Sequence, residues 1–385
     1  MKSPESDIRV IVVGIGSAGL HLLDKLAAVG LPAGYFIVMD SDCQSLHRCQ
    51  IAERIQLGKT SRRGWGCSGD TAEGASCVRA ARDRVAAKLK SADMVIVVAG
   101  MGGGMGGGGA PVVAEIASEG GALVLSIAIE PFDLEGRGEV SDLALQRLIQ
   151  VSDTVIRIPN QSIMEQMTTG CSVQKCLEIS NGRILEAMIG LGRLVRSDGL
   201  LNIDFTHVNK LLRGQHGESH LATIEMAGDI RPRAVMDELM KHPFFGTGNG
   251  FSQASGMIVS LVGDDSFNMD EVIEFAEYLE SMATKIPRVF GVHVDKTMNS
   301  RIGAMLLVPS SFAQKIDLGQ KSSINRRNRT VETTNGQLIR EIDGFQQQLP
   351  LVSVSKGRFD KSEPNLQDGE DMDVPTFLRR NMIFN

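Results

Sequence analysis

Short apolar runs alternate with amphipathic segments through the first two-fifths of the chain. Each run is rich in β-branched residues, and an intervening segment such as 20–28 places its apolar residues at helical spacing. Short buried strands separated by helices are typical of a parallel sheet with both faces covered. The pattern therefore predicts a Rossmann-like α/β domain over residues 1–171. Its expected strands are 8–13, 35–39, 94–99, 123–129 and 154–158.

A long helix and a second domain follow. Apolar residues recur at helical spacing from 172 to 196, which predicts one central helix within 172–198 despite interior glycines at 182, 190 and 192. Residues 199–312 then form a stretch of about a hundred residues, a common size for an independent core. We expect an α+β domain there, with strands at 255–262, 288–294 and 303–308 and helices at 233–240 and 270–282.

The pattern changes again near the C-terminus. Residues 313–370 are dominated by Gln, Asn, Ser, Lys and Arg, and their apolar residues lose periodicity, which predicts a flexible, disordered linker. The tail, 371–385, regains apolar character. An apolar motif at the end of such a linker is typical of a partner-docking peptide, with a merely sticky tail as the alternative.

Composition narrows the class of protein. The 385 residues carry a net charge of -6, which argues against nucleic acid as a partner, because nucleic-acid binding needs a positive field. The six cysteines include no C-x-x-C pair, so neither a zinc site nor a disulfide framework is expected. We find no signal peptide and no apolar stretch long enough to span a bilayer, so we expect a soluble, intracellular protein without direct membrane insertion.

Glycine-rich turns are the strongest chemical signal. Residues 14–19 match G-x-G-x-x-G between an expected strand and an expected helix, and Asp40 ends the next strand. That arrangement predicts phosphate binding, and taken locally it is also the fingerprint of an NAD-binding oxidoreductase.

A second and denser glycine run, 99–111, follows the strand at 94–99 and precedes the helix at 112–119, and a smaller one lies at 64–69. Backbone N–H groups in such loops cradle anions. Since several cradles follow successive strands, the sequence predicts a polyphosphate enclosed from several sides.

These segments resemble, in order, motifs of the FtsZ/tubulin family. The loop at 99–111 is similar to that family's G-G-G-T-G-T-G signature, and the turn at 14–19 to its first phosphate loop. Further matches are 40–46 with N-T-D-A-Q-A-L, 131–137 with P-F-x-F-E-G-R, 158–160 with I-P-N, 200–205 with L-I-N-x-D-F and 373–380 with D-I-P-A-F-L-R-R.

The resemblance implies a cytoplasmic GTPase of the division site that binds GTP or GDP with Mg²⁺ and polymerises head to tail. It implies that 373–380 docks on a membrane-tethering division protein such as FtsA. Catalysis would fall to Asn202, Asp204 and His207, reaching into the neighbouring subunit. The residues implied to contact nucleotide are Gly16, Ser17, Ala18, Gly19, Leu20, His21, Gly69, Gly102, Gly103, Gly104, Met105, Gly106, Gly107, Glu135, Glu139, Asn160 and Gly182.

The chain departs from the family pattern at several of these positions. His207 replaces a second acid, and Met105 and Gly107 replace the signature threonines. Gly182 replaces an Asp that reads the guanine edge, and Glu139 replaces an Arg that meets the phosphates. Leu20, His21 and Leu177 also differ from the family's residues. We therefore expect slow hydrolysis and weak guanine selectivity. A non-hydrolysing paralogue that acts as a filament scaffold is the alternative within the family.

Overall fold

The computed structural model describes residues 8–28, 35–58, 64–165, 172–194, 201, 203–227, 232–242, 251, 254–284, 286–310, 366–367 and 370–371. The chain divides into two compact units, Met1–Gln320 and Lys321–Asn385. In the second unit only β11 (Leu366–Gln367) and β12 (Glu370–Asp371) are described, as a short antiparallel pair. The rest of the predicted linker and the motif at 373–380 lie outside the described residues. Within the described ranges, no helix is long and apolar enough to cross a membrane.

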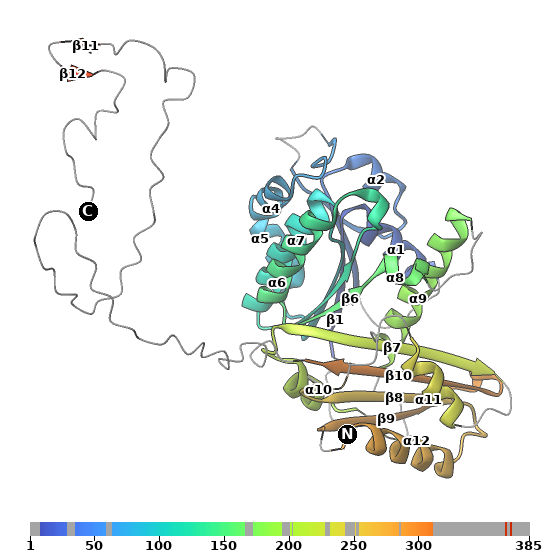
Figure 1. The fold of residues 1–385 in the computed structure, drawn as a ribbon. Coiled ribbons are helices and arrows are strands. Elements are labelled where there is room, and N and C mark those ends of the chain that lie inside the picture. Colours follow the sequence, from blue (N-terminus) through green and yellow to red (C-terminus); the bar gives the residue numbers. More distant parts are fainter. Residues whose placement is uncertain are drawn as a thin grey trace, which may run out of the picture. The chain divides into compact units, whose positions relative to one another are not determined.

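One ten-stranded sheet runs through the first unit in the order β3-β2-β1-β4-β5-β6-β7-β10-β8-β9 (Figure 1). Strands β3 to β7 are parallel to their neighbours, β10 is antiparallel to both β7 and β8, and β8 and β9 are parallel. The strands are β1 (Val10–Ile15), β2 (Tyr35–Asp40), β3 (Glu53–Gln56), β4 (Met94–Gly100), β5 (Leu123–Ile129), β6 (Thr154–Ile158), β7 (Gly217–Ala227), β8 (Met257–Gly263), β9 (Arg288–Val294) and β10 (Arg301–Pro309).

Helices cover both faces of the sheet (Figure 1). They are α1 (Gly16–Ala28), α2 (Cys43–Arg48), α4 (Thr71–Arg79), α5 (Arg82–Leu89), α6 (Ala110–Glu119), α7 (Gly138–Val151), α8 (Asn160–Glu165), α9 (Val173–Leu194), α10 (Phe205–Leu212), α11 (Pro232–Met240) and α12 (Met269–Met282), with short helical turns at Gly104–Gly109, Asp133–Glu135 and Lys296–Met298.

The alternation of side chains along the strands creates two cores from one sheet. Val10 and Val12 of β1 face α1 and α9, whereas Ile11 and Val13 face the layer formed by α4, α5, α6 and α7. Both sides of β1 are fully apolar because both are covered. A third core lies where α11 and α12 pack on β7, β8 and β10, around Phe275.

The apolar runs of the sequence are all strands, so the predicted α/β fold with a parallel sheet is confirmed. The long helix is present as α9, and its Gly190 has a packing reason: a Cβ there would lie 2.9 Å from Met305 Sδ and 3.0 Å from Thr223 Cγ2. Strands β3 and β7 were not predicted. β3 is a short polar edge strand, and β7 mixes polar with apolar residues without a continuous apolar run. Because β7 pairs with both β6 and β10, it joins the two predicted domains in one sheet.

Candidate functional site

The turn after β1 can be built only with glycine at several positions. A Cβ on Gly14 would lie 2.7 Å from Gly19 O, and one on Gly19 would lie 2.4 Å from Val98 O. Gly16 has φ +72°, in the left-handed region that favours glycine. The turn therefore presses the start of α1 against the end of β4. The first N–H groups of α1 have no intrahelical partner, which suits them to an anion.

The loop after β4 is packed, not flexible. Its glycines form a π-helical turn over Gly104–Gly109 in which every residue is buried. A Cβ on Gly106 would lie 2.1 Å from Gly100 O, and one on Gly108 would lie 1.9 Å from Thr71 O. Met105 is 5% exposed and contributes to the core shared with α4 and α6. Met105, which stands where the family pattern has a threonine, thus anchors the loop in this core.

The third glycine-rich loop covers residues 64–69. Gly64, Gly66 and Gly69 all have positive φ, and Asp70 caps α4 by accepting from the N–H groups of Ala72 and Glu73. The loop carries Trp65, the single tryptophan of the chain, with 85% of its surface exposed. The fluorescence of an indole in this position should change when a ligand covers the loop.

On the opposite side, the segment after β5 is held by local hydrogen bonds. Phe132 N donates to Glu135 Oε1 over 2.9 Å, which fixes the turn at 132–135. Asn160, after β6, donates through Nδ2 to Glu130 O over 2.9 Å and accepts from Ser180 Oγ of α9 over 2.6 Å. The asparagine therefore links this segment to the long helix.

These loops surround one cavity of about 430 Å³ at the carboxyl ends of β1, β2, β4, β5 and β6. Ligand sites of open α/β sheets lie at this edge. Of the predicted nucleotide residues, those that line it are Gly16, Ser17, Ala18, Gly69, Gly102, Gly103, Gly104, Met105, Gly106, Glu135 and Asn160.

The other predicted nucleotide residues do not line the cavity, for separate reasons. Leu20 is 3% exposed in the core beneath α1. His21 and Glu139 are exposed on α1 and α7. Gly19 and Gly107 are buried under their loops, where a Cβ on Gly107 would lie 2.7 Å from Met101 O. The last of these residues, Gly182, is half-buried on α9.

The lining residues are acidic as well as glycine-rich. Asp40, Asp42, Glu130 and Glu135 line the cavity, and Arg137 is the sole cation among the described lining residues. Glu130 is held by Arg157, whose Nε lies 2.6 Å from Glu130 Oε1. A hydrogen bond from Ser45 Oγ lowers the pKa of Asp42 below its usual range.

Asp40 is the exception among these acids. It is 3% exposed, and its Oδ1 accepts from the N–H groups of Ser41 (2.7 Å) and Asp42 (3.1 Å). Its Oδ2 is buried without a hydrogen-bond partner among the described atoms. Burial raises the pKa of Asp40 above its usual range, although the two backbone hydrogen bonds oppose that shift.

Arg137 and Trp65 were not among the residues expected to contact nucleotide, although both lie in segments, 131–137 and 64–69, that the sequence connects with the site. Arg137 lies over the glycine loop, since a Cβ on Gly102 would be 3.3 Å from Arg137 Cδ. Its nearest acid is Glu135, at 4.0 Å. Arg137 is the last residue of the matched P-F-x-F-E-G-R motif, which was the available signal, but only the fold shows that it lines the cavity.

The predicted catalytic residues lie elsewhere in the fold. Asn202 is outside the described residues. Asp204 caps α10, its Oδ1 accepting from Thr206 N over 2.8 Å, and this hydrogen bond lowers the pKa of the exposed carboxyl. His207 follows on the first turn of α10 and is exposed. Neither side chain lines the cavity.

Helix α10 packs at the other end of the molecule. Ile203 lies against Gly291 of β9, and Leu211 lies against Gly256 before β8. The last turn of α10 reaches the amino ends of β5 and β6, whereas the cavity lies at their carboxyl ends, roughly 20 Å away for a strand of this length. Figure 1 shows α10 beside β8 and far from α2.

Comparisons with known proteins agree with this architecture. Residues 9–168 match the Tubulin/FtsZ family, GTPase domain. The chain is 29% identical to cell division protein FtsZ 1 of Pyrococcus abyssi over 82% of this chain and 84% of that protein. It is 27% identical to cell division protein FtsZ of Coxiella burnetii over 98% and 97% of the two chains. A solved FtsZ dimer from M. jannaschii matches with a TM-score of 0.73 and 26% identity over 79% and 88%.

Asp40→Asn should stabilise the ligand-free protein at pH 7. Ionised Asp40 is buried with one oxygen unpaired, which typically costs about 1–3 kcal/mol, and an amide removes the charge while keeping the Oδ1 acceptor. Because the folded-state pKa is raised, the native protein loses stability as pH rises from the unfolded value of 3.8 through the raised pKa. Urea unfolding at several pH values should show that loss disappear in the variant.

Asp42→Asn is the matched control and should act in the opposite direction. Its carboxylate has a lowered pKa, so it stabilises the native protein above the unfolded pKa, and the variant should unfold at lower urea at neutral pH. An Asp40→Asn protein that is less stable than the native chain, or that keeps the native pH dependence, would contradict the role assigned to burial.

Proposed function

Because the chain belongs to the tubulin/FtsZ family, as a divergent member, we propose that it binds GTP in the cavity and assembles head to tail into cell-division filaments. GTP is hydrolysed slowly at each interface by Asp204 and His207 of the adjoining subunit, together with Asn202, which lies outside the described residues. The filaments act in the cytoplasm at the division site.

One observation carries this proposal: the cavity and the first turn of α10 lie at opposite ends of the same sheet. A subunit's own Asp204 therefore does not reach its own cavity. Stacking a second subunit on the cavity end, in the same orientation, brings that subunit's α10 over the ligand. Repetition of a head-to-tail contact that does not close gives a filament.

The cavity suits a polyphosphate. Backbone N–H groups of the loops at 14–19 and 100–109 surround the place where α1 begins, and Arg137 adds a guanidinium at the rim. Backbone donors bind phosphate without the hydroxyls that the family's threonines supply.

Asp204 and His207 can act on water. The hydrogen bond from Thr206 N keeps Asp204 ionised at neutral pH, so it can accept a hydrogen bond from the attacking water. His207 is three residues further along the helix and shares its face. An imidazole carries no fixed negative charge, so it aligns water and a cation less well than a second acid does, and turnover is slow.

Magnesium is expected to enter with GTP. Among the residues that the structure describes, no three His, Cys, Asp or Glu side chains cluster as a metal site. The cation would therefore take most of its ligands from phosphate oxygens and water, as Mg²⁺ commonly does. No step assigned to these side chains runs through the metal.

Two variants that each lack one half of the interface provide the central test. Asp204→Ala should bind GTP without hydrolysing it, and Ser17→Asp should repel phosphate from the exposed start of α1. Phosphate release should be absent from either variant alone and recovered when they are mixed, since Asp204 of one then meets GTP held by the other. A mixture that stays inactive although the native protein hydrolyses GTP would refute a shared site.

His207→Asp should raise the rate of phosphate release by at least about 10-fold, because a positioned acid–base group contributes about 10²–10⁴-fold. The measurement is GTP turnover per assembled subunit. A native protein that polymerises without any turnover would instead favour the filament scaffold. A fast native rate that falls in His207→Asp would mean that the histidine itself is the working base.

Arg137→Gln should weaken GTP binding about 10-fold, as expected for loss of a charge-assisted hydrogen bond at a partly exposed site. Arg147→Gln is the control and should bind as the native chain does, because Arg147 is exposed on α7, the helix that Arg137 precedes, and does not line the cavity. Quenching of Trp65 fluorescence gives both affinities. ATP should compete in the same titrations, because Gly182 has no side chain to read guanine. Equal affinities of the two variants would remove Arg137 from the site.

The tail at 373–380 docks on a membrane-tethering division protein of the FtsA type. Apolar Val374, Phe377 and Leu378 beside two arginines support this. Deletion of residues 371–385 should leave assembly of the purified protein unchanged and abolish recruitment to vesicles that carry the tether. Failure of the shortened chain to assemble would place the tail in the filament core instead.

A further inference from the structure

Helix α10 needs an external anchor to hold its catalytic turn in place. It has eight residues, a length of about 12 Å, and a helix this short is marginal in water by itself. Val208 and Leu212 are buried, but the first turn, with Asp204 and His207, is exposed. Ile203, just before the helix, lies against Gly291 of β9, so the direction of the first turn depends on this contact and on how the last turn is fixed.

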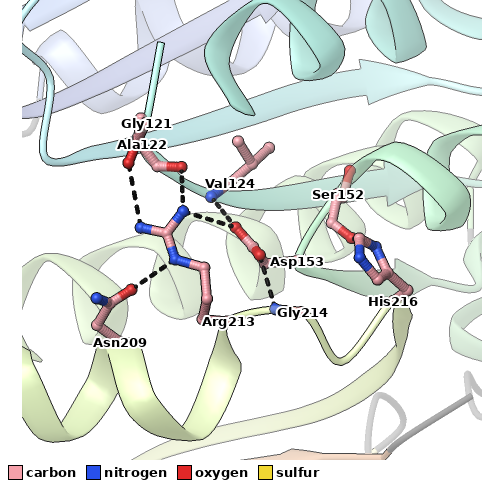
Figure 2. Close-up of polar contacts among 9 residues, drawn as sticks. All are labelled: Gly121, Ala122, Val124, Ser152, Asp153, Asn209, Arg213, Gly214 and His216. Carbon is pink, nitrogen blue, oxygen red and sulfur yellow. Dashed lines mark hydrogen bonds and ion pairs between the residues drawn. The ribbon is translucent and has the colours of Figure 1, made fainter. Parts of the chain in front are cut away.

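Arg213, directly after α10, anchors the helix through three side-chain hydrogen bonds (Figure 2). Its Nη1 donates to Ala122 O over 2.9 Å and its Nη2 to Gly121 O over 3.2 Å. Its Nε donates back to Asn209 Oδ1, one turn earlier in α10, over 2.9 Å. The planar guanidinium thus ties the helix to the turn that precedes β5, and a lysine ammonium has no such fork.

Asp153 completes the anchor from the start of β6. It is 5% exposed, and its Oδ2 accepts from Val124 N of β5 while its Oδ1 accepts from Gly214 N, each over 2.8 Å. Its Oδ2 also lies 3.9 Å from Arg213 Nη1. One buried carboxylate thereby joins β5, β6 and the residue after Arg213 (Figure 2).

His216 also binds the turn after α10 to the residues that precede β6. Its backbone N–H donates to Asp153 O over 3.0 Å, and its ring Nδ1 lies 2.9 Å from Ser152 O. Gly214 has φ +69° and His216 has φ +43°, so the chain reverses sharply between α10 and β7. The end of α10 is therefore held to the sheet at several points.

The two strands that carry the anchor also carry the cavity. β5 begins directly after Ala122 and leads to Glu130 and Pro131, which line the cavity, and β6 leads to Asn160. From these contacts, and resting on the function proposed above, we infer that Arg213 is a positioning residue for hydrolysis. With Asp153, it fixes the orientation of α10, and so of Asp204, relative to the subunit's own nucleotide end.

The length of α10 sets the expected loss in the rate of hydrolysis when Arg213 is replaced. A tilt of about 5° at Arg213 moves the far end of a 12 Å helix by about 1 Å. A misplacement of about 1 Å can cost on the order of 10²-fold in rate. Nucleotide binding does not involve α10, so the loss should appear in kcat per assembled subunit and not in GTP affinity.

The experiment compares Arg213→Gln with Arg301→Gln in the full-length chain. Arg301 is similarly exposed and also pairs with an acid, Glu225 at 2.9 Å, but lies outside the anchor. Arg213→Gln should bind GTP with native affinity, assemble within about 2-fold of the native critical concentration and release phosphate at least 10-fold more slowly. Arg213→Lys should also remain slow, and Arg301→Gln should match the native protein in every measurement.

Hydrogen–deuterium exchange of residues 205–212 gives a readout that does not depend on activity. Exchange should rise in unassembled Arg213→Gln and stay native in Arg301→Gln. If the native protein hydrolyses GTP and Arg213→Gln does so at the same rate, the positioning role is wrong while the proposed function stands. Loss of GTP binding together with turnover, or unchanged exchange in 205–212, would also overturn it. A native protein without turnover would refute the proposed function first.

Discussion

Close backbone contact between two glycine turns is the constraint on which the site depends. A Cβ on Gly16 would lie 3.1 Å from Gly106 N, one on Gly19 would lie 2.4 Å from Val98 O, and one on Gly106 would lie 2.1 Å from Gly100 O. Contact this close leaves no room for side chains, so the turns after β1 and β4 meet through their main chains. The cavity wall therefore consists largely of peptide groups. Peptide groups can bind an anion through their dipoles with few basic residues, which accords with Arg137 as the sole cation among the described lining residues.

The acidic lining adds a second constraint. Glu130 is neutralised by Arg157, Glu135 is bound to Phe132 N, and Asp42 is bound to Ser45, so three of these acids are already engaged by the protein. Among these four acids, only Asp40 has a buried oxygen without a hydrogen-bond partner in the described part of the chain. A hydrogen bond does not cancel a carboxylate's charge, and of these described acids only Glu130 has an ion-pair partner outside the cavity lining. The backbone N–H groups of the glycine loops and Arg137 would therefore have to offset the acidic lining when an anion binds.

Polarity of the sheet connects the cavity with the rest of the molecule. Parallel strands place every loop that builds the cavity at one edge, and the anchor of α10 at the other. A subunit with a ligand end and a separate end bearing Asp204 is asymmetric along its length, which suits a head-to-tail row. Arg213 and Asp153 then matter because they fix the distance between the two ends within each subunit.

Local patterns in the sequence were sufficient to predict much of this fold. Continuous apolar runs predicted β1, β2, β4, β5 and β6, because a strand buried on both faces must be apolar throughout, and the glycine runs indicated the phosphate loops. β7 escaped prediction because its partners β6 and β10 are distant in sequence, and a polar side chain such as Ser219 finds its partner only there, in Thr154 Oγ1. The family resemblance also implied that Leu20 and Gly107 contact nucleotide, but neither lines the cavity, because Leu20 is buried in the core and Gly107 under its loop. That Arg137 faces the cavity, that Asp40 lacks a partner and that Arg213 reaches Gly121 are all decided by contacts between distant segments, which only the tertiary structure brings together.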